Sequence, residues 1–275
     1  MTTQETVYAI ASGKGGVGKT TTTVNLGTAL AGAGNRVVIV DVDLGMANLA
    51  GFVSLSPGDT TLHQVLADDA DVSEATYELA NGIWAVPSGI ELDSYASVQT
   101  ENLRDVVDYL RNRFDYVLLD VGAGVSHETV LPLGLADAVL LVSTPEPASV
   151  QDARKTCDLT ERAGGTIAGI ILNRTRPSSD VDHEGIAEQL DLTLLVTIPE
   201  DLTVRESVYA GTPLVVHDPK TPASRAYRYL AARLLGEAGP EDMPTFSTTA
   251  AAGKSGSDAA SEDDVSAAIS EVDQD

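Results

Sequence analysis

The feature that most constrains this 275-residue chain is a glycine-rich loop close to its N-terminus. The loop runs from Gly13 to Thr20 and fits the pattern G-x-x-x-x-G-K-[ST]. It lies between an apolar run at 6–11 and a helical pattern at 20–33. A strand, a glycine-rich turn and a helix in this order direct several backbone amides and a helix N-terminus at one point. The sequence therefore predicts a phosphate-binding loop beside a parallel sheet.

Apolar runs alternate with helical patterns along the next 200 or so residues, which is typical of a parallel sheet covered on both faces. The strand-like runs lie at 36–41, 83–87, 116–120, 138–143, 166–173 and 192–198. The helical patterns lie at 62–67, 100–113, 149–163, 183–189, 204–210 and 222–236. We therefore expect an α/β fold, doubly wound around a mostly parallel sheet, with ligands at the carboxyl ends of the strands.

Composition divides the chain after residue 239. Residues 1–239 carry the alternating pattern and are expected to form one domain, whereas residues 240–275 hold nine acidic residues and one lysine. Such a segment buries too little apolar surface to fold alone, so we expect a disordered acidic tail. One stripe with helical spacing interrupts it, either by chance or as a docking segment for a partner. The stripe consists of Val265, Ala268, Ile269 and Val272.

The charge of the chain is −24, from 41 acidic and 17 basic residues. This balance favours adaptation to a salt-rich cytoplasm over a specific repulsion of nucleic acid or anionic lipid, so it says little about partners. The one cysteine, Cys157, allows no intramolecular disulfide and is expected to be a small buried residue. No signal peptide or membrane span is predicted, and we expect a cytoplasmic protein.

Residue types within the loop predict individual roles. Lys19 should reach the β- and γ-phosphates of a nucleotide, the Thr20 hydroxyl should bind Mg²⁺, and Thr21 should contact the α-phosphate. Glycines let the backbone wrap closely around the phosphates. The amides expected to do so belong to Gly13, Lys14, Gly15, Gly16, Val17 and Gly18. The predicted ligands are ATP and Mg²⁺.

A second lysine inside the loop, Lys14, makes it resemble the deviant Walker A motif of the MinD/ParA family of partitioning and positioning ATPases. The resemblance extends over about 235 residues and implies a P-loop NTPase fold. In that family the early lysine crosses a nucleotide-sandwich dimer to the phosphates of the other subunit. The resemblance therefore implies that Lys14 and Lys19 are catalytic, and that ATP hydrolysis is slow and depends on dimerisation.

Two further segments carry the resemblance. The pattern D-x-D-x-x-x-x-N, from Asp41 to Asn48, resembles the family's switch I, which implies that Asp43 positions the attacking water. The apolar run that ends at Asp120 resembles a Walker B strand, which implies that Asp120 holds a magnesium-bound water. The implied metal site consists of Thr20 directly, with Asp41 and Asp120 acting through water.

The segment after Asp120 departs from the family pattern D-x-P-A-G. Gly122 replaces the stiff proline, although Gly124 can still offer its amide to the γ-phosphate. We expect a looser switch II, which puts the rate of hydrolysis in question more than the binding of nucleotide.

Two strand ends match the family positions that enclose adenine. Asn173 and Arg174 end one strand, and Pro199 and Asp201 follow the next. The Asn173 amide can pair with the amino group and N7 of adenine. No carboxylate occupies the two positions after Arg174, as a guanine site would require, so ATP is favoured over GTP.

The segments 144–153, 200–207 and 210–214 resemble the MinD branch more than the ParA branch. We therefore expect an ATP-dependent dimerisation switch for spatial positioning of a division site or of polar, motility or chemotaxis assemblies. Its partners would be a second copy of itself and an unidentified protein. The tail lacks the basic amphipathic helix of bacterial MinD proteins, so it does not support membrane attachment. Concentration at poles or membrane would then depend on a partner.

Two alternatives remain open. A ParA-like DNA-partitioning ATPase would require a basic patch, and no Lys/Arg cluster appears in the sequence, so nucleic acid is not expected as a partner. A metabolic or metal-trafficking ATPase would require additional ligand side chains. The four histidines lie far apart without metal-ligand spacing; they are His63, His127, His183 and His217.

Overall fold

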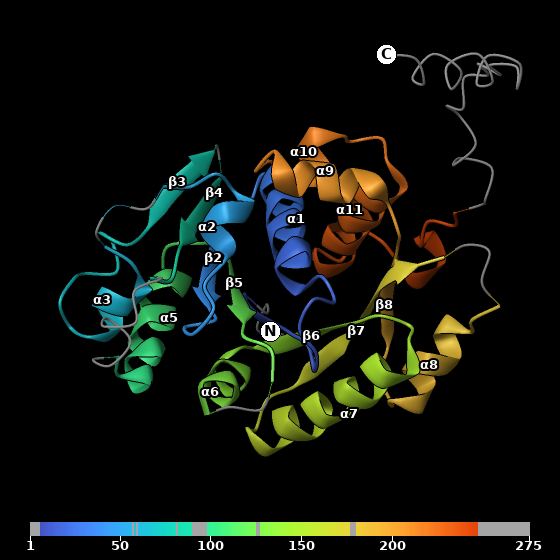
Figure 1. The fold of residues 1–275 in the computed structure, drawn as a ribbon, viewed down its shortest axis with the longest axis horizontal. Coiled ribbons are helices and arrows are strands. Elements are labelled where there is room, and N and C mark those ends of the chain that lie inside the picture. The colour runs from blue at the N-terminus through green and yellow to red at the C-terminus, as the bar shows by residue number, and fades with distance from the viewer. Residues whose placement is uncertain are drawn as a thin grey trace, which may run out of the picture.

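The computed structural model describes residues 6–56, 58, 60–80, 82–89, 98–124, 127–176 and 180–246, with residues 127 and 128 described by their main chain only. Within these residues, eight strands form one sheet in the order β3-β4-β2-β5-β1-β6-β7-β8 (Figure 1). Neighbouring strands are parallel, except that β3 is antiparallel to β4. The bounds are β1 Val7–Ala11, β2 Val37–Val42, β3 Tyr77–Ala80, β4 Ile83–Val86, β5 Tyr116–Val121, β6 Ala138–Ser143, β7 Ile167–Thr175 and β8 Leu194–Pro199. This sheet confirms the predicted fold class.

Helices cover both faces of the sheet (Figure 1). One face carries α1 (Lys19–Gly32), α2 (Leu49–Phe52), α9 (Leu202–Tyr209), α10 (Leu214–His217) and α11 (Pro222–Leu234). The other face carries α3 (Leu62–Leu66), α5 (Leu103–Arg111), α6 (His127–Leu135), α7 (Pro147–Arg162) and α8 (His183–Gln189). The described part of the chain contains no helix long and apolar enough to span a membrane.

The neighbouring strands β2 and β5 bring the first site residues together. Both strands are buried along their whole length and consist of aliphatic residues, apart from Tyr116 and one aspartate in each strand. Their parallel register pairs Asp41 directly with Asp120. Because side chains alternate along a strand, paired positions point to the same face of the sheet. Two acidic side chains 79 positions apart in sequence therefore lie side by side.

Some elements differ from the sequence prediction. Neither α6 nor β3 was predicted, since α6 contains Pro132 and a glycine, and β3 is a short, half-exposed strand. The single helix expected at 100–113 is a 3₁₀ turn at Thr100–Asn102 followed by α5. The helix expected at 222–236 ends at Leu234, and it packs against α1 and β8.

The segment 240–246 lies against the domain. Phe246 and Met243 pack on the core, and the Arg225 guanidinium lies 5.4 Å from the centre of the Phe246 ring. The Tyr229 hydroxyl donates a hydrogen bond to the Gly239 carbonyl at 2.8 Å. The predicted domain boundary after residue 239 and the acidic tail stay predictions. The stripe from Val265 to Val272 lies outside the described residues.

The start of β1 is fixed by Asp137. One carboxylate oxygen accepts from the amides of Thr6 and Val7 at 2.9 Å each, and the other accepts from the Arg111 guanidinium at 2.7 Å. Partial burial alone would raise the pKa of Asp137, but the two amides and Arg111 together lower it below its usual range. The charged carboxylate is therefore favoured in the folded protein.

We expect Asp137→Ala to lower the free energy of unfolding by about 1–3 kcal/mol, because the two amides lose their acceptor. A carboxylate with a lowered pKa stabilises above its ordinary pKa and loses that effect as pH falls through the folded value. The difference between wild type and variant should thus shrink in acid, as measured by urea unfolding from pH 7 to pH 3. Asp108→Ala, at an exposed position of α5, is the control and should change stability by less than about 0.5 kcal/mol.

Candidate functional site

The glycine-rich loop connects the central strand β1 to α1, at the carboxyl end of the sheet. Gly16 and Gly18 have φ values of 78° and 98°, which favour glycine. A Cβ at Gly18 would lie 2.1 Å from the Asn173 amide nitrogen, and one at Gly13 would lie 2.1 Å from the Asp152 carbonyl. The described residues leave open space around Gly15, Gly16 and Gly124. The loop is thus packed at its base and open on the side where a ligand would lie.

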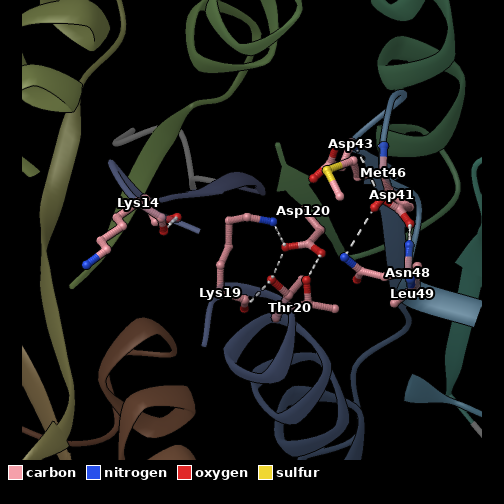
Figure 2. Close-up of polar contacts among 11 residues, drawn as sticks. Lys14, Lys19, Thr20, Asp41, Asp43, Met46, Asn48, Leu49 and Asp120 are labelled. Atoms are coloured by element: carbon pink, nitrogen blue, oxygen red, sulfur yellow. Dashed lines mark hydrogen bonds and ion pairs between the residues drawn. The ribbon is translucent and has the colours of Figure 1, made fainter. Parts of the chain in front are cut away.

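A buried cluster forms where α1 begins (Figure 2). The Lys19 ammonium donates to Asp120 Oδ1 at 2.9 Å, and the Thr20 hydroxyl donates to Asp120 Oδ2 at 2.6 Å. All three side chains are buried, so the ion pair lies in a low-dielectric setting. The structure therefore brings together three of the residues that the sequence predicted as a phosphate and metal site.

Asp41 lies next to this cluster and is also buried (Figure 2). Its carboxylate accepts from the amides of Asp43 at 3.2 Å and of Asn48 and Leu49 at 3.0 Å each. Burial, and secondly the negative charge of Asp120, raise the pKa of Asp41 to about 7, although the three amides lower it. Two carboxylates that repel each other beside a threonine hydroxyl are a set of oxygen ligands that suits a divalent cation.

Asp43 lies on the loop that follows β2, and its carboxylate accepts from the Met46 amide at 3.2 Å. It faces the segment after β5, since a Cβ at Gly122 would lie 3.2 Å from the Asp43 carboxyl group. The missing side chain at Gly122 therefore leaves room for the Asp43 carboxylate. Gly122, which replaces the proline of the family pattern D-x-P-A-G, therefore lies directly against Asp43.

Lys14 is separated from the buried cluster. Its side chain is exposed and points away from Lys19 and Asp120 (Figure 2). Among the described residues, its ammonium group has neither a hydrogen bond nor an ion-pair partner. A charged group in this position can reach a ligand or a second molecule without first breaking an internal ion pair.

The predicted adenine residues lie at the ends of two adjacent strands. Asn173 is buried, and its amide nitrogen donates to the Val17 carbonyl at 2.8 Å, which connects it to the glycine-rich loop. Pro199 lies on the neighbouring strand, opposite Thr175. The Asp201 carboxylate caps α9 by accepting from the Thr203 amide at 2.9 Å. These contacts connect Asn173 to the loop and place Pro199 beside the end of β7, while adenine recognition by them stays a prediction.

Arg174 has a left-handed backbone with a φ of 56°, and its side chain is exposed. Its amide donates to the Asn173 side-chain oxygen at 2.9 Å. Thr21 lies in the first turn of α1 and is partly exposed. The contacts of neither side chain assign it a ligand, so their predicted roles in nucleotide binding remain predictions.

Sequence reasoning missed two residues of the site. The Thr23 hydroxyl lies 3.0 Å from Asp120 Oδ1, and the Ser88 hydroxyl donates to the Asp41 carbonyl at 2.7 Å. Thr23 follows Lys19 by four positions and so lies on the same face of α1, a spacing that the sequence does contain. No local pattern identifies Ser88, because it follows β4 and reaches the site only through the packing of β4 beside β2.

The described residues contain no group of three or more His, Cys, Asp or Glu side chains arranged for a metal ion. A magnesium ion at Thr20, Asp41 and Asp120 would therefore take most of its ligands from phosphate and water. Mg²⁺ commonly binds proteins in this way, through one or two carboxylates together with substrate phosphates. The donor set thus fits Mg²⁺ bound together with a nucleotide.

A doubly wound sheet with a lysine-bearing glycine loop at the carboxyl end of its central strand defines a nucleotide-binding protein of the P-loop class. A family model described as the CobQ/CobB/MinD/ParA nucleotide binding domain matches residues 8–214. The chain belongs to this family.

Several known proteins are similar to the chain over most of its length. An ATP-binding protein of Methanocaldococcus jannaschii is 38% identical over 83% of this chain and 87% of its own. The septum site-determining protein MinD of Bacillus subtilis is 35% identical, with 84% and 89% covered. The septum site-determining protein MinD of Pyrococcus horikoshii, solved with Mg-ADP, is 33% identical with a TM-score of 0.79, covering 83% of this chain and 95% of that one. The predicted MinD/ParA relationship is confirmed.

Proposed function

We propose that this protein binds ATP with Mg²⁺ at the β1–α1 loop and hydrolyses it. The observation that carries the proposal is the buried contact of Lys19 and Thr20 with Asp120, directly below an open glycine-rich loop. Phosphate oxygens would compete with Asp120 for the Lys19 ammonium, and the N-terminus of α1 adds its positive dipole end. The related MinD of Pyrococcus horikoshii, solved with Mg-ADP, supports the binding of an adenine nucleotide with Mg²⁺ here.

Thr20, Asp41 and Asp120 would hold the magnesium ion, the two carboxylates through water. When bound, Mg²⁺ supplies positive charge against the β- and γ-phosphates. Its presence would also relieve the repulsion between Asp41 and Asp120. Asp43, which lies beside this pair and against Gly122, would orient the attacking water by accepting its hydrogen bond.

The exposed ammonium group of Lys14 supports a dimeric mechanism. Two subunits that face each other across ATP would each offer Lys14 to the phosphates of the other. A cation supplied from a second subunit neutralises charge that develops during phosphoryl transfer, as an arginine finger does. Hydrolysis would then be slow in the monomer and would require the dimer.

The output of such a switch would be spatial. The B. subtilis relative carries the name septum site-determining protein, and we extend to this chain a MinD-like role in positioning a division site or another localised assembly. A further protein would recognise the ATP dimer, and hydrolysis would return the subunits to monomers. We place the protein in the cytoplasm, with polar or membrane concentration arising through that partner.

The mass in solution tests this proposal. By light scattering, the 28.6 kDa chain should roughly double in mass with Mg-ATP, and remain a monomer with Mg-ADP or without nucleotide. Asp43→Ala should keep the doubled mass long after wild type has returned to a monomer, because it binds ATP but turns it over slowly. Asp108→Ala is the control and should behave as wild type. An equal mass in all nucleotide states would contradict the dimeric mechanism and leave Lys14 without its proposed role.

A further inference from the structure

His63 on α3 is a buried histidine that connects two loops at the proposed site. Its side chain is only 1% exposed, and both of its ring nitrogens have main-chain partners. Nε2 lies 3.1 Å from the Leu44 carbonyl, and Nδ1 lies 2.8 Å from the Gly89 amide. Leu44 belongs to the loop after β2, and Gly89 to the loop after β4.

These two partners determine the tautomer of the ring. A main-chain amide can only donate, so Nδ1 accepts from Gly89 and carries no proton. A carbonyl can only accept, so Nε2 carries the proton and donates it to Leu44. His63 is therefore a neutral ring in one defined orientation. A Cβ at Gly89 would lie 3.2 Å from Nδ1, which shows how closely this backbone approaches the ring.

Both loops that His63 connects also contact Asp41. Leu44 follows Asp43 directly in sequence, and the Asp43 amide donates to the Asp41 carboxylate. Gly89 follows Ser88, whose hydroxyl donates to the Asp41 carbonyl at 2.7 Å. The His63 ring thus connects the loop that carries Asp43 to the loop whose Ser88 hydroxyl binds the Asp41 carbonyl.

The loop after β2 has one fixed part and one exposed part. The Leu44 side chain is buried in the core formed with α3 and α5, whereas Met46, two residues later, is 78% exposed. Asp43 lies between Asp41, which accepts its amide, and Leu44, whose carbonyl is held by His63. The position of the Asp43 carboxylate therefore depends on both anchors.

We propose that His63 is a positioning residue for hydrolysis, which sets the place of Asp43 by holding the Leu44 carbonyl. The inference rests on the proposed function, in which Asp43 orients the attacking water. His63 acts through Leu44, so its loss should lower kcat and leave the KM for ATP almost unchanged.

Two conservative variants separate the two hydrogen bonds of the ring. The side-chain amide of Gln reaches the place of Nε2, so His63→Gln keeps a donor for Leu44 and loses the acceptor for Gly89. The side-chain oxygen of Asn lies at the place of Nδ1, so His63→Asn keeps the acceptor for Gly89 and loses the donor to Leu44. We expect kcat to fall at least about 10-fold in His63→Asn and at most about 3-fold in His63→Gln. His217→Asn, an exposed histidine on α10, is the control.

Hydrogen exchange measures the positioning without any turnover. In His63→Asn the amides of residues 43–49 should exchange at least about 10-fold faster than in wild type, and in His63→Gln they should stay close to wild type. If wild type hydrolyses no ATP, the proposed function is wrong, and the exchange rates still decide whether His63 holds the loop. The role of His63 would be overturned if both variants lost kcat equally and showed equal amide exchange rates. It would also be overturned if neither variant changed kcat or the exchange rates.

Discussion

Lys14→Ala is expected to lower ATP hydrolysis per subunit at least about 100-fold, while ATP affinity stays within about 3-fold of wild type. In trans, a cation at the transferring phosphate is worth a rate factor of roughly 10³ to 10⁵ in related chemistry, so a 100-fold loss is a modest expectation. Because the Lys14 side chain is exposed and forms no hydrogen bond or ion pair within the described residues, its removal should leave stability unchanged. Steady-state hydrolysis and titration with a fluorescent ATP analogue measure the two quantities.

Lys19→Ala is the matched variant, since both lysines belong to one loop. Lys19 is buried and paired with Asp120 at 2.9 Å, and it is expected to bind the phosphates of its own subunit. Its loss should weaken ATP binding about 100-fold, which corresponds to roughly 2.7 kcal/mol. It should also destabilise the fold by about 3 kcal/mol, because a buried carboxylate loses its cation. Thr20 and Thr23 remain beside Asp120, so we expect the domain to fold.

The contrast between these two lysines is what tests the mechanism. If Lys14→Ala weakens ATP binding as much as Lys19→Ala does, both lysines act within one subunit. If Lys14→Ala hydrolyses ATP at the wild-type rate, the cation does not act across a dimer. Mixing Lys14→Ala with Asp43→Ala provides a further check, because in a mixed dimer one site keeps Asp43 and receives Lys14 from the other subunit. That mixture should recover part of the activity.

The phosphate loop and the buried strands could be predicted from sequence because each is encoded locally. The glycine loop between a strand and a helix fixes its own conformation, and the aliphatic runs of β2 and β5 identify strands buried on both faces. Asp41 and Asp120 stand out as charged residues in those runs. Their pairing across the β2–β5 register follows from the parallel sheet.

The contacts that could not be predicted are those between distant segments. Asn173 donates to the Val17 carbonyl across 156 positions, and His63 joins Leu44 to Gly89. No periodicity marks such residues, because their partners are main-chain atoms brought close only by the packing of helices on the sheet. Helix α6 was missed because Pro132 lies inside it and gives the segment a low helix propensity. The segment is helical nevertheless, because tertiary contacts override this local preference.

Asp41→Asn is expected to stabilise the protein at pH 8 by about 3 kcal/mol relative to wild type, the cost of the buried charge less the cost of one lost hydrogen bond. Burial, and then the charge of Asp120, raise the pKa of Asp41 from 3.8 to about 7. The folded protein therefore binds a proton between pH 4 and pH 7 that the unfolded chain releases, so wild-type stability falls as pH rises through this window. Each unit of pKa corresponds to about 1.4 kcal/mol, and asparagine has no charge to bury.

At low pH the order should reverse. Asn48 and Leu49 donate to one oxygen of Asp41, and the Asp43 amide donates to the other. Asparagine has a single oxygen, so one amide loses its acceptor. The variant should be less stable than wild type by about 1 kcal/mol near pH 3, below the pKa of Asp41 in the unfolded chain. Urea unfolding at constant ionic strength from pH 3 to pH 8 measures the difference between the two proteins. Taking this difference removes the effects of the other acidic residues, which both proteins share.

Asp115→Asn serves as the control, because its carboxylate is about half exposed to solvent. The stability difference between this variant and wild type should change little over the same pH range. If the stability difference between Asp41→Asn and wild type were also independent of pH, the charge of Asp41 would not destabilise the folded protein. In that case the repulsion between Asp41 and Asp120 would not help to attract a cation. A rising difference, together with loss of Mg-dependent hydrolysis in Asp41→Asn, would show that the site retains a destabilising carboxylate because the reaction requires it.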